Sequence, residues 1–222
     1  MSGISTYQAG QSDLELAPRD LAVLLAPYDA SHPLLPTLEG SGGALNIPSY
    51  YVSVGNFTKS AGVTLGHTPE ITDVDSHGKA SPTRQLPNRR VITIGFEPQE
   101  TKLVNLALYW GTDWLSNVPT VSANAGFAEA IPELPLNLKF RAILLGWDDF
   151  NGDDIFIYWI ANKVNVSATS DQELVDSNVI RYPYTLNCQA DDENQSALTV
   201  GICGPGWEAL QDVAATGFGG DS

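Results

Sequence analysis

The chain has 222 residues, the length of one domain or of one domain with extended arms. It carries 26 acidic and 11 basic residues, and the formal net charge of -15 argues against binding to DNA, RNA or an anionic membrane through a basic surface. Hydrophobic residues make up 43% of the chain, but the longest apolar run, 155–161, is too short to span a bilayer, so we expect a folded domain without a membrane segment.

Residues 1–43 are predicted to form an extended N-terminal arm. Four prolines between residues 18 and 36 exclude a long regular element, and the glycine-rich segment 40–43 ends the stretch. Only residues 21–26 suit a short strand within it.

Strands are predicted at intervals along the rest of the chain. Residues 50–54 and 89–96 alternate between two faces with the period of a strand. Further extended segments, rich in β-branched and aromatic residues, are predicted over 63–75, 138–147, 154–166 and 179–189. Pro183 places the last of these at a sheet edge or a bulge.

One helix is predicted, over about 100–110. Leu103, Leu106, Ala107 and Trp110 recur with helical spacing and would form its apolar face. Gly111 then ends the helix. Further along, Asn151-Gly152 predicts a tight hairpin between 138–147 and 154–166.

These elements predict an all-β fold, an antiparallel β-sandwich or barrel with one short flanking helix. The predicted division is an arm over 1–43, the β-domain over 44–208 and a flexible tail over 209–222. The final six residues, rich in glycine, should fray.

Two polar clusters in the sequence contain candidate metal ligands. Asp73, Asp75 and His77 would point the same way on a strand and could bind a divalent metal, or they could belong to a polar turn. Residues 148–154 partly resemble a calcium-binding loop. Trp147 and Tyr158, however, fall at the positions where that loop needs acidic ligands, so a charged hairpin tip is favoured.

Other signs of catalysis are also missing from the sequence. Cys188 has no basic neighbour in sequence to activate it, and the spacing of Cys188 and Cys203 suggests no disulfide. Residues 1–15 show no secretory signal, so we expect reduced thiols in a cytoplasmic product. We therefore predict no enzyme activity and no catalytic, cofactor or metal site.

Four segments, taken in order, resemble the major tail protein, or tail tube subunit, of long-tailed siphovirus-type phages that infect actinobacteria. The first is the apolar segment 21–27, and the second is the strand 89–101, which runs into the helix 102–109. The third is the strand 140–148, with its Gly-x-Asp turn, and the fourth is 182–187, followed by Gly-Pro-Gly-Trp at 204–207. Together they cover about residues 15 to 208.

The resemblance implies a structural virion protein whose hexameric rings stack into a tail tube. Such a tube encloses the tape measure protein, meets the tail terminator and distal tail proteins at its ends, and conducts DNA into the host without binding it specifically. Assembly would take place in the cytoplasm of the bacterial host. Six copies would give a ring about -90 in charge, and acids facing the lumen would repel the DNA backbone; acidity for solubility alone is the alternative.

The polar segment 66–90 is predicted to be a long loop that makes ring-to-ring contacts. Its length has no chemical explanation, and it contains Arg84, Arg89 and Arg90 in an acid-rich chain. Arginine forks match carboxylates on a neighbouring ring, so these three residues are the candidate assembly site. The alternative is a mobile surface loop.

A second function from another class is a monomeric β-sandwich that binds carbohydrate. Five tryptophans could supply stacking platforms. Against this reading, Trp110, Trp147 and Trp159 lie in the predicted helix face or strands, where core packing is expected.

Overall fold

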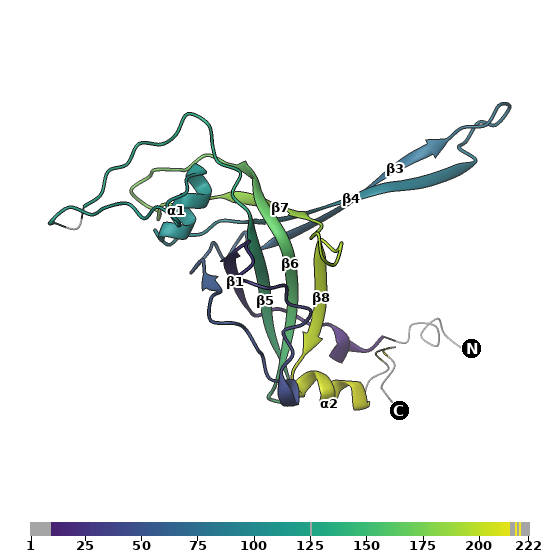
Figure 1. The fold of residues 1–222 in the computed structure, drawn as a ribbon. Helices are drawn as coiled ribbons and strands as arrows, with labels where there is room; N and C mark the ends of the chain where they lie inside the picture. Colours follow the sequence, from purple (N-terminus) through teal and green to yellow (C-terminus); the bar gives the residue numbers. More distant parts are fainter. Residues whose placement is uncertain (1–9, 125, 214–215, 217, 219–222) are drawn as a thin grey trace.

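The computed structural model describes residues 10–124, 126–213, 216 and 218. This part of the chain contains eight strands and two α-helices (Figure 1). The strands are β1 (Asp20–Pro27), β2 (Val52–Ser53), β3 (Thr64–Val74), β4 (Arg84–Phe96), β5 (Phe140–Phe150), β6 (Asp153–Thr169), β7 (Tyr184–Gln189) and β8 (Leu198–Cys203). The helices are α1 (Leu103–Trp110) and α2 (Pro205–Val213).

All the strands belong to one antiparallel sheet with the order β2-β1-β5-β6-β7-β4-β3. The 17-residue β6 pairs with three strands. β5 runs along one side of it, and β7 and β8 share the other side. The first half of β6 pairs with β8, from Phe156 opposite Cys203, and the second half pairs with β7, from Lys163 opposite Gln189. The predicted all-β antiparallel class is confirmed.

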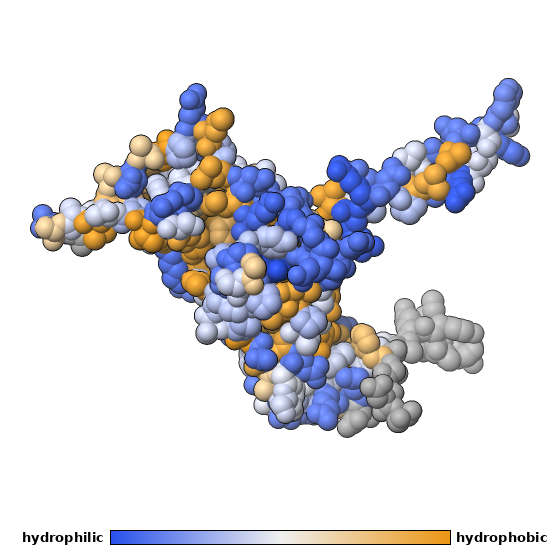
Figure 2. All heavy atoms as spheres, in the orientation of Figure 1, coloured by the Kyte–Doolittle hydropathy of each residue, from blue (hydrophilic) through white to orange (hydrophobic). Residues whose placement is uncertain are grey.

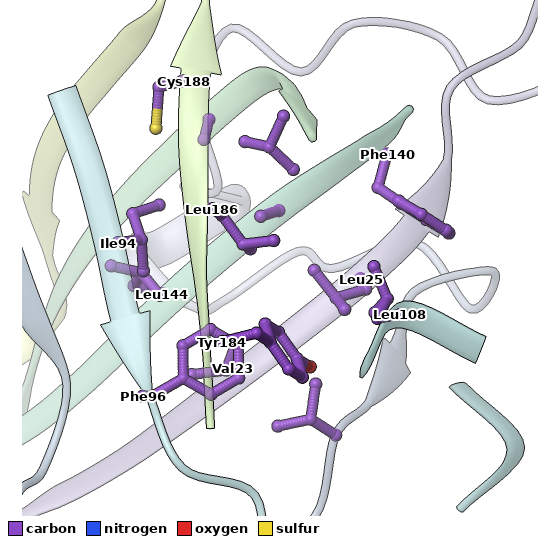
Figure 3. Packing of buried hydrophobic residues seen from close by; sticks show 14 of the residues in the cluster. Val23, Leu25, Ile94, Phe96, Leu108, Phe140, Leu144, Tyr184, Leu186 and Cys188 are labelled. Carbon is purple, nitrogen blue, oxygen red and sulfur yellow. The ribbon is translucent and has the colours of Figure 1, made fainter. Parts of the chain in front are cut away.

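The principal core lies where the sheet curls over itself. Side chains of β1 and β5 meet those of β4 and β7 there, and α1 closes one side (Figure 3). The rings of Phe96 and Tyr184 pack edge to face with centroids 5.0 Å apart. Other buried members of this core are Val23, Leu25, Ile94, Leu108, Phe140, Leu144, Leu186 and Cys188.

The opposite face of β1 and β5 is buried as well. Ala26 and Ile143 pack there against Leu38 and Tyr51, which come from the segment between β1 and β2. Burial on both faces explains why residues 142–145 are apolar at four consecutive positions instead of alternating.

The predicted hairpin at Asn151-Gly152 is confirmed. Asn151 has φ 55° and Gly152 has φ 93°, the left-handed conformations that a two-residue hairpin turn requires. The turn joins β5 to β6, with Phe150 opposite Asp153.

Helix α1 is present, but its predicted buried face is wrong by about one residue. The structure buries Val104, Asn105, Ala107 and Leu108, while Trp110 is 36% exposed. Asn105 sits on the inner face because its side-chain amide donates hydrogen bonds to the carbonyls of Val54 (2.9 Å) and Glu100 (2.8 Å). Gly111 ends the helix with φ 62°, as predicted.

The segment predicted as an N-terminal arm contributes β1, which lies inside the sheet between β2 and β5. All eight residues of β1 pair with β5, from Asp20 opposite Trp147 to Pro27 opposite Phe140. The strand expected at 21–26 is therefore confirmed. The division into residues 1–43, 44–208 and 209–222 stays a prediction, although β1 places part of the first segment inside the sheet.

Neither β8 nor α2 was predicted from the sequence. Pro205 and Gly206 resemble a loop, yet proline suits the first turn of a helix. Leu210 of α2 packs against Ile155 and Ile157 of β6. The predicted tail thus begins within α2; of the final six residues, Phe218 contacts the Trp207 ring and the others lie outside the described residues. Neither helix of the described part is long and apolar enough to cross a membrane.

Candidate functional site

The most conspicuous surface feature is a hairpin that leaves the body of the molecule (Figure 1). β4 pairs with β7 only from Ile92 to Phe96, and its preceding residues pair with β3 alone. Every residue from 67 to 90 is exposed. We call residues 67–90 the β3–β4 arm. The prediction of a long loop over 66–90 is wrong, because β3 and β4 continue through most of this segment. The extended segment predicted over 63–75 is confirmed as β3.

Side-chain hydrogen bonds hold the two strands of the arm together. The Gln85 amide donates to Asp73 (2.9 Å), and the Asn88 amide donates to Thr72 (2.5 Å) at a bulge between the paired strands. Nearer the tip, the hydroxyls of Ser76 and Thr83 lie 2.7 Å apart. These polar pairs explain why a sequence without apolar alternation still forms strands.

The three predicted assembly residues all lie on β4, within the arm. Arg89 donates two hydrogen bonds to Glu70 on β3, of 2.6 and 2.7 Å. The hydrogen bonds from Arg89 lower the pKa of the Glu70 carboxyl below its ordinary value. Arg84 and Arg90 have no side-chain hydrogen bond or ion pair within the described residues. Arg89 therefore serves the arm itself, whereas Arg84 and Arg90 remain available to another molecule.

The arm differs in charge from the rest of the chain. It holds four of the 11 bases and three of the 26 acids, a net charge of +1, so the remaining residues carry -16. Its surface is mainly polar with an apolar spot partway along (Figure 2). Ile71, Val74 and Leu86 supply the exposed apolar side chains of the arm.

The contacts within the arm contribute little to its stability. No residue of it belongs to a buried core cluster, and a two-stranded hairpin is only marginally stable in water. Exposed ion pairs such as Arg89 with Glu70 contribute little to stability. An arm with these properties is suited to contact with another molecule.

The metal reading of Asp73, Asp75 and His77 is not supported by their placement. Asp73 is on β3 and accepts the Gln85 hydrogen bond, whereas Asp75 and His77 follow the strand in the turn. No group of three His, Cys, Asp or Glu residues in the described ranges is arranged to hold a metal ion.

Cys188 is buried in the principal core, and burial raises the pKa of its thiol to about 12. A thiol with that pKa is protonated at neutral pH and is a poor nucleophile. This placement agrees with the reading of Cys188 as a core residue.

The tryptophans do not form a stacking platform. Trp147 donates a hydrogen bond to Asp154 (2.7 Å), Trp159 packs at the core, and Trp114 packs against Phe127. Trp110 is the most exposed of the five and contacts the Tyr109 ring edge to face. Within the part of the chain that the structure describes, no row of exposed aromatic side chains supports the carbohydrate-binding alternative.

An antiparallel β-body with a projecting arm, on which Arg84 and Arg90 have no partner among the described residues, fits a protein that contacts other molecules through its surface. The family model for phage tail tube proteins matches residues 10–200, and the chain belongs to that family. It is accordingly a structural component of the virion tail, and the predicted absence of enzyme activity agrees with this family.

Among solved structures, one titled "Crystal structure of Hcp protein" is similar over 82% of this chain and 97% of that chain, with 4% sequence identity and a TM-score of 0.30. No curated protein sequence matches the chain.

Proposed function

We propose that this chain is the major tail tube subunit of a siphovirus-type, long-tailed phage of actinobacteria. Six copies form a ring, and rings stack into a tube that encloses the tape measure protein and conducts DNA into the host. The tail terminator and distal tail proteins cap the tube, and assembly takes place in the cytoplasm of the host. Membership of the tail tube family supports the tube, and the order of the sequence motifs supports the phage type.

The β3–β4 arm is the observation that carries the assembly proposal. It projects from the body, contributes nothing to the cores and presents Arg84 and Arg90 without partners among the described residues. We propose that the arm makes the ring-to-ring contact, with these two arginines pairing with carboxylates of the next ring. Arg89 takes part by keeping the two strands of the arm in register through Glu70.

The charge distribution supports the conduit role. A subunit with -16 outside the arm gives a strongly acidic ring, and a negative lumen wall lets DNA slide without adhering. If lumen acids act in this way, replacing a ring of them by lysine slows DNA ejection. Unchanged ejection kinetics would count against a role for the wall charge.

Deletion of residues 79–87 tests the arm. Because the deleted residues are exposed and lie outside all three cores, the variant should stay folded with a thermal midpoint within a few degrees of the parent. Negative-stain electron microscopy of concentrated protein should then show single particles or rings in place of tubes. Tubes of normal length from the folded deletion variant would end the proposal.

A charge-preserving control separates arginine chemistry from arm length. The triple variant R84K/R89K/R90K keeps the charge but loses the forked geometry, and R84E/R89E/R90E reverses the charge. We expect no tubes from the second and weakened tube formation from the first.

A further inference from the structure

Two long loops emerge together at the end of the molecule opposite the arm (Figure 1). One, residues 112–139, joins α1 to β5, and the other, residues 170–183, joins β6 to β7. The Tyr109 hydroxyl donates to the carbonyl of Ser170 (2.8 Å), and a cleft of about 290 Å³ between the loop bases is lined by Leu136 and Thr169. We call these two loops the loop pair.

The loop pair is unusually apolar for a surface. It holds ten of the large hydrophobic side chains that are exposed in the described residues: Val118, Val121, Phe127, Ile131, Leu134, Leu136, Leu174, Val175, Val179 and Ile180. Leu134 is 77% exposed and Leu174 is 74% exposed. Apolar side chains gathered in this way mark an interaction surface.

The loop pair is also acidic. It contains six acids against two bases, Lys139 and Arg181, and Arg181 already contacts Glu97 at 3.3 Å. Glu129, Glu133 and Glu173 are exposed and have no side-chain partner among the described residues. The surface therefore presents unpaired carboxylates between apolar side chains.

We infer that the loop pair is the surface on which the β3–β4 arm of a second copy docks. The two surfaces match in kind, because the arm presents unpaired Arg84 and Arg90 beside Ile71, Val74 and Leu86. The net charge of +1 on the arm and the net charge of -4 on the loop pair attract each other. Complementary charges of this kind speed the association of two surfaces and also determine the register in which they dock. The inference rests on the proposed function and names the acceptor that the arm uses.

The positions of the two surfaces determine the type of assembly. The arm and the loop pair lie on opposite sides of the body (Figure 1), so one copy cannot satisfy both with a single partner. A contact between unlike surfaces is heterologous, and repeating it produces a closed ring or an extended assembly rather than a dimer. Because the proposed function places the arm between rings, we expect the extended assembly, in which the contact repeats along the tube.

Reversed charges provide the first test. We expect R84E/R90E and E129K/E133K each to raise the concentration needed for assembly at least about tenfold, which corresponds to the loss of one close charge pair. A chain carrying all four substitutions has the charges exchanged and should assemble within about threefold of the parent. The matched control is E15K/E193K, which makes the same change in net charge on exposed acids outside the loop pair.

The outcomes separate this inference from the proposed function. If R84E/R90E prevents assembly and the quadruple variant R84E/R90E/E129K/E133K does not restore assembly, the acceptor surface lies elsewhere. The role of the arm then still stands. If R84E/R90E assembles like the parent, both the inference and the role of the arm are overturned.

Cross-linking between copies is the second test. L86C places a thiol on the arm and L134C places one on the loop pair, and the native Cys188 and Cys203 are buried. Oxidising a mixture of the two variants after assembly should give interchain dimers, because a disulfide requires Cα atoms within about 7 Å. The control mixture uses V200C, a position on β8 that is 60% exposed, in place of L134C. No dimer from the first mixture, or equal dimer from the control, would overturn the inference.

Discussion

Arg141 and Asp191 form an ion pair that is almost completely removed from solvent. Nη1 of Arg141 lies 3.3 Å from Oδ2 of Asp191, and the two side chains are 7% and 1% exposed. Arg141 also donates hydrogen bonds to the carbonyls of His32 (2.8 Å) and Asn162 (2.9 Å). The pair thus joins the segment after β1 to β6 and to the loop between β7 and β8.

Removing one member of this pair should be costly. Burial alone would raise the pKa of Asp191, but hydrogen bonds from Glu193 and Tyr28, together with the charge of Arg141, hold that pKa below its ordinary value. Asp191→Asn leaves Arg141 buried without a counter-charge, and we expect a loss of about 3–5 kcal/mol in the free energy of unfolding, measured with urea. The control is Asp192, which pairs with Lys163 but has a side chain that is 85% exposed, so Asp192→Asn should cost less than about 1 kcal/mol. Equal effects at the two sites would contradict the argument.

Asn105 is a second buried polar residue whose replacement should destabilise the fold. Its amide is bonded to two backbone carbonyls, and the Tyr184 hydroxyl donates to its oxygen (3.4 Å). Asn105→Leu leaves the Val54 carbonyl and the Tyr184 hydroxyl unsatisfied, so we expect a loss of about 2–4 kcal/mol. The exposed Asn117→Leu should change stability by less than about 0.5 kcal/mol, and chemical denaturation of both variants checks this.

Gly204 should tolerate no side chain. Its φ is 118°, and a Cβ atom there would lie 2.3 Å from the carbonyl oxygen of Asp154, so Gly204→Ala forces β8 and α2 away from β6. Gly78, at the tip of the arm, has φ 80° with open space around it. We expect Gly204→Ala to lower the thermal midpoint much more than Gly78→Ala, whose cost is backbone strain of about 1 kcal/mol. A smaller effect at Gly204 than at Gly78 would show that α2 is held differently.

Stability should fall in alkaline solution. Burial raises the pKa of Cys188 to about 12, and burial also raises the pKa of Tyr184 and of Tyr51. In the unfolded chain the thiol loses its proton at about pH 8.5 and the tyrosine hydroxyls lose theirs at about pH 10. The folded state therefore binds more protons above pH 8.5, and the free energy of unfolding decreases as the pH rises.

Thermal unfolding followed by circular dichroism between pH 7 and 12 measures this fall. Tyr184→Phe removes one of the groups with a raised pKa, so its stability should decline less steeply between pH 10 and 12 than that of the parent. An identical slope in the two proteins would show that Tyr184 keeps an ordinary pKa.

The strands with strong apolar patterns were predictable from the sequence. The turn at Asn151-Gly152 and the segments around β5 and β6 follow from turn chemistry and β-branched runs, both of which act locally. The predicted tail tube family is also confirmed. That prediction came from the order of short motifs along the chain.

The extended segment predicted over 63–75 corresponds to β3, but the first residues of β4 and the inner face of α1 were not predictable in the same way. The strands of the arm are held by pairs such as Gln85 with Asp73 and Arg89 with Glu70, and polar cross-strand pairs leave no hydrophobic period. Asn105 is buried by its hydrogen bonds to distant carbonyls, which no local pattern records. The loop pair was missed because apolar residues inside irregular loops resemble ordinary core positions until their exposure is known.

The pairing of β1 with β5 has a consequence for the order of folding during synthesis. Asp20 lies opposite Trp147, so the partner of β1 leaves the ribosome about 130 residues after it. At a translation rate of about 5–20 residues per second, β1 waits roughly 6–25 s for β5. During this interval the short β2 can pair only with Leu24 and Leu25, so most of residues 20–27 present an unpaired apolar strand edge. A nascent chain of this kind is a natural substrate for chaperones that bind extended apolar segments.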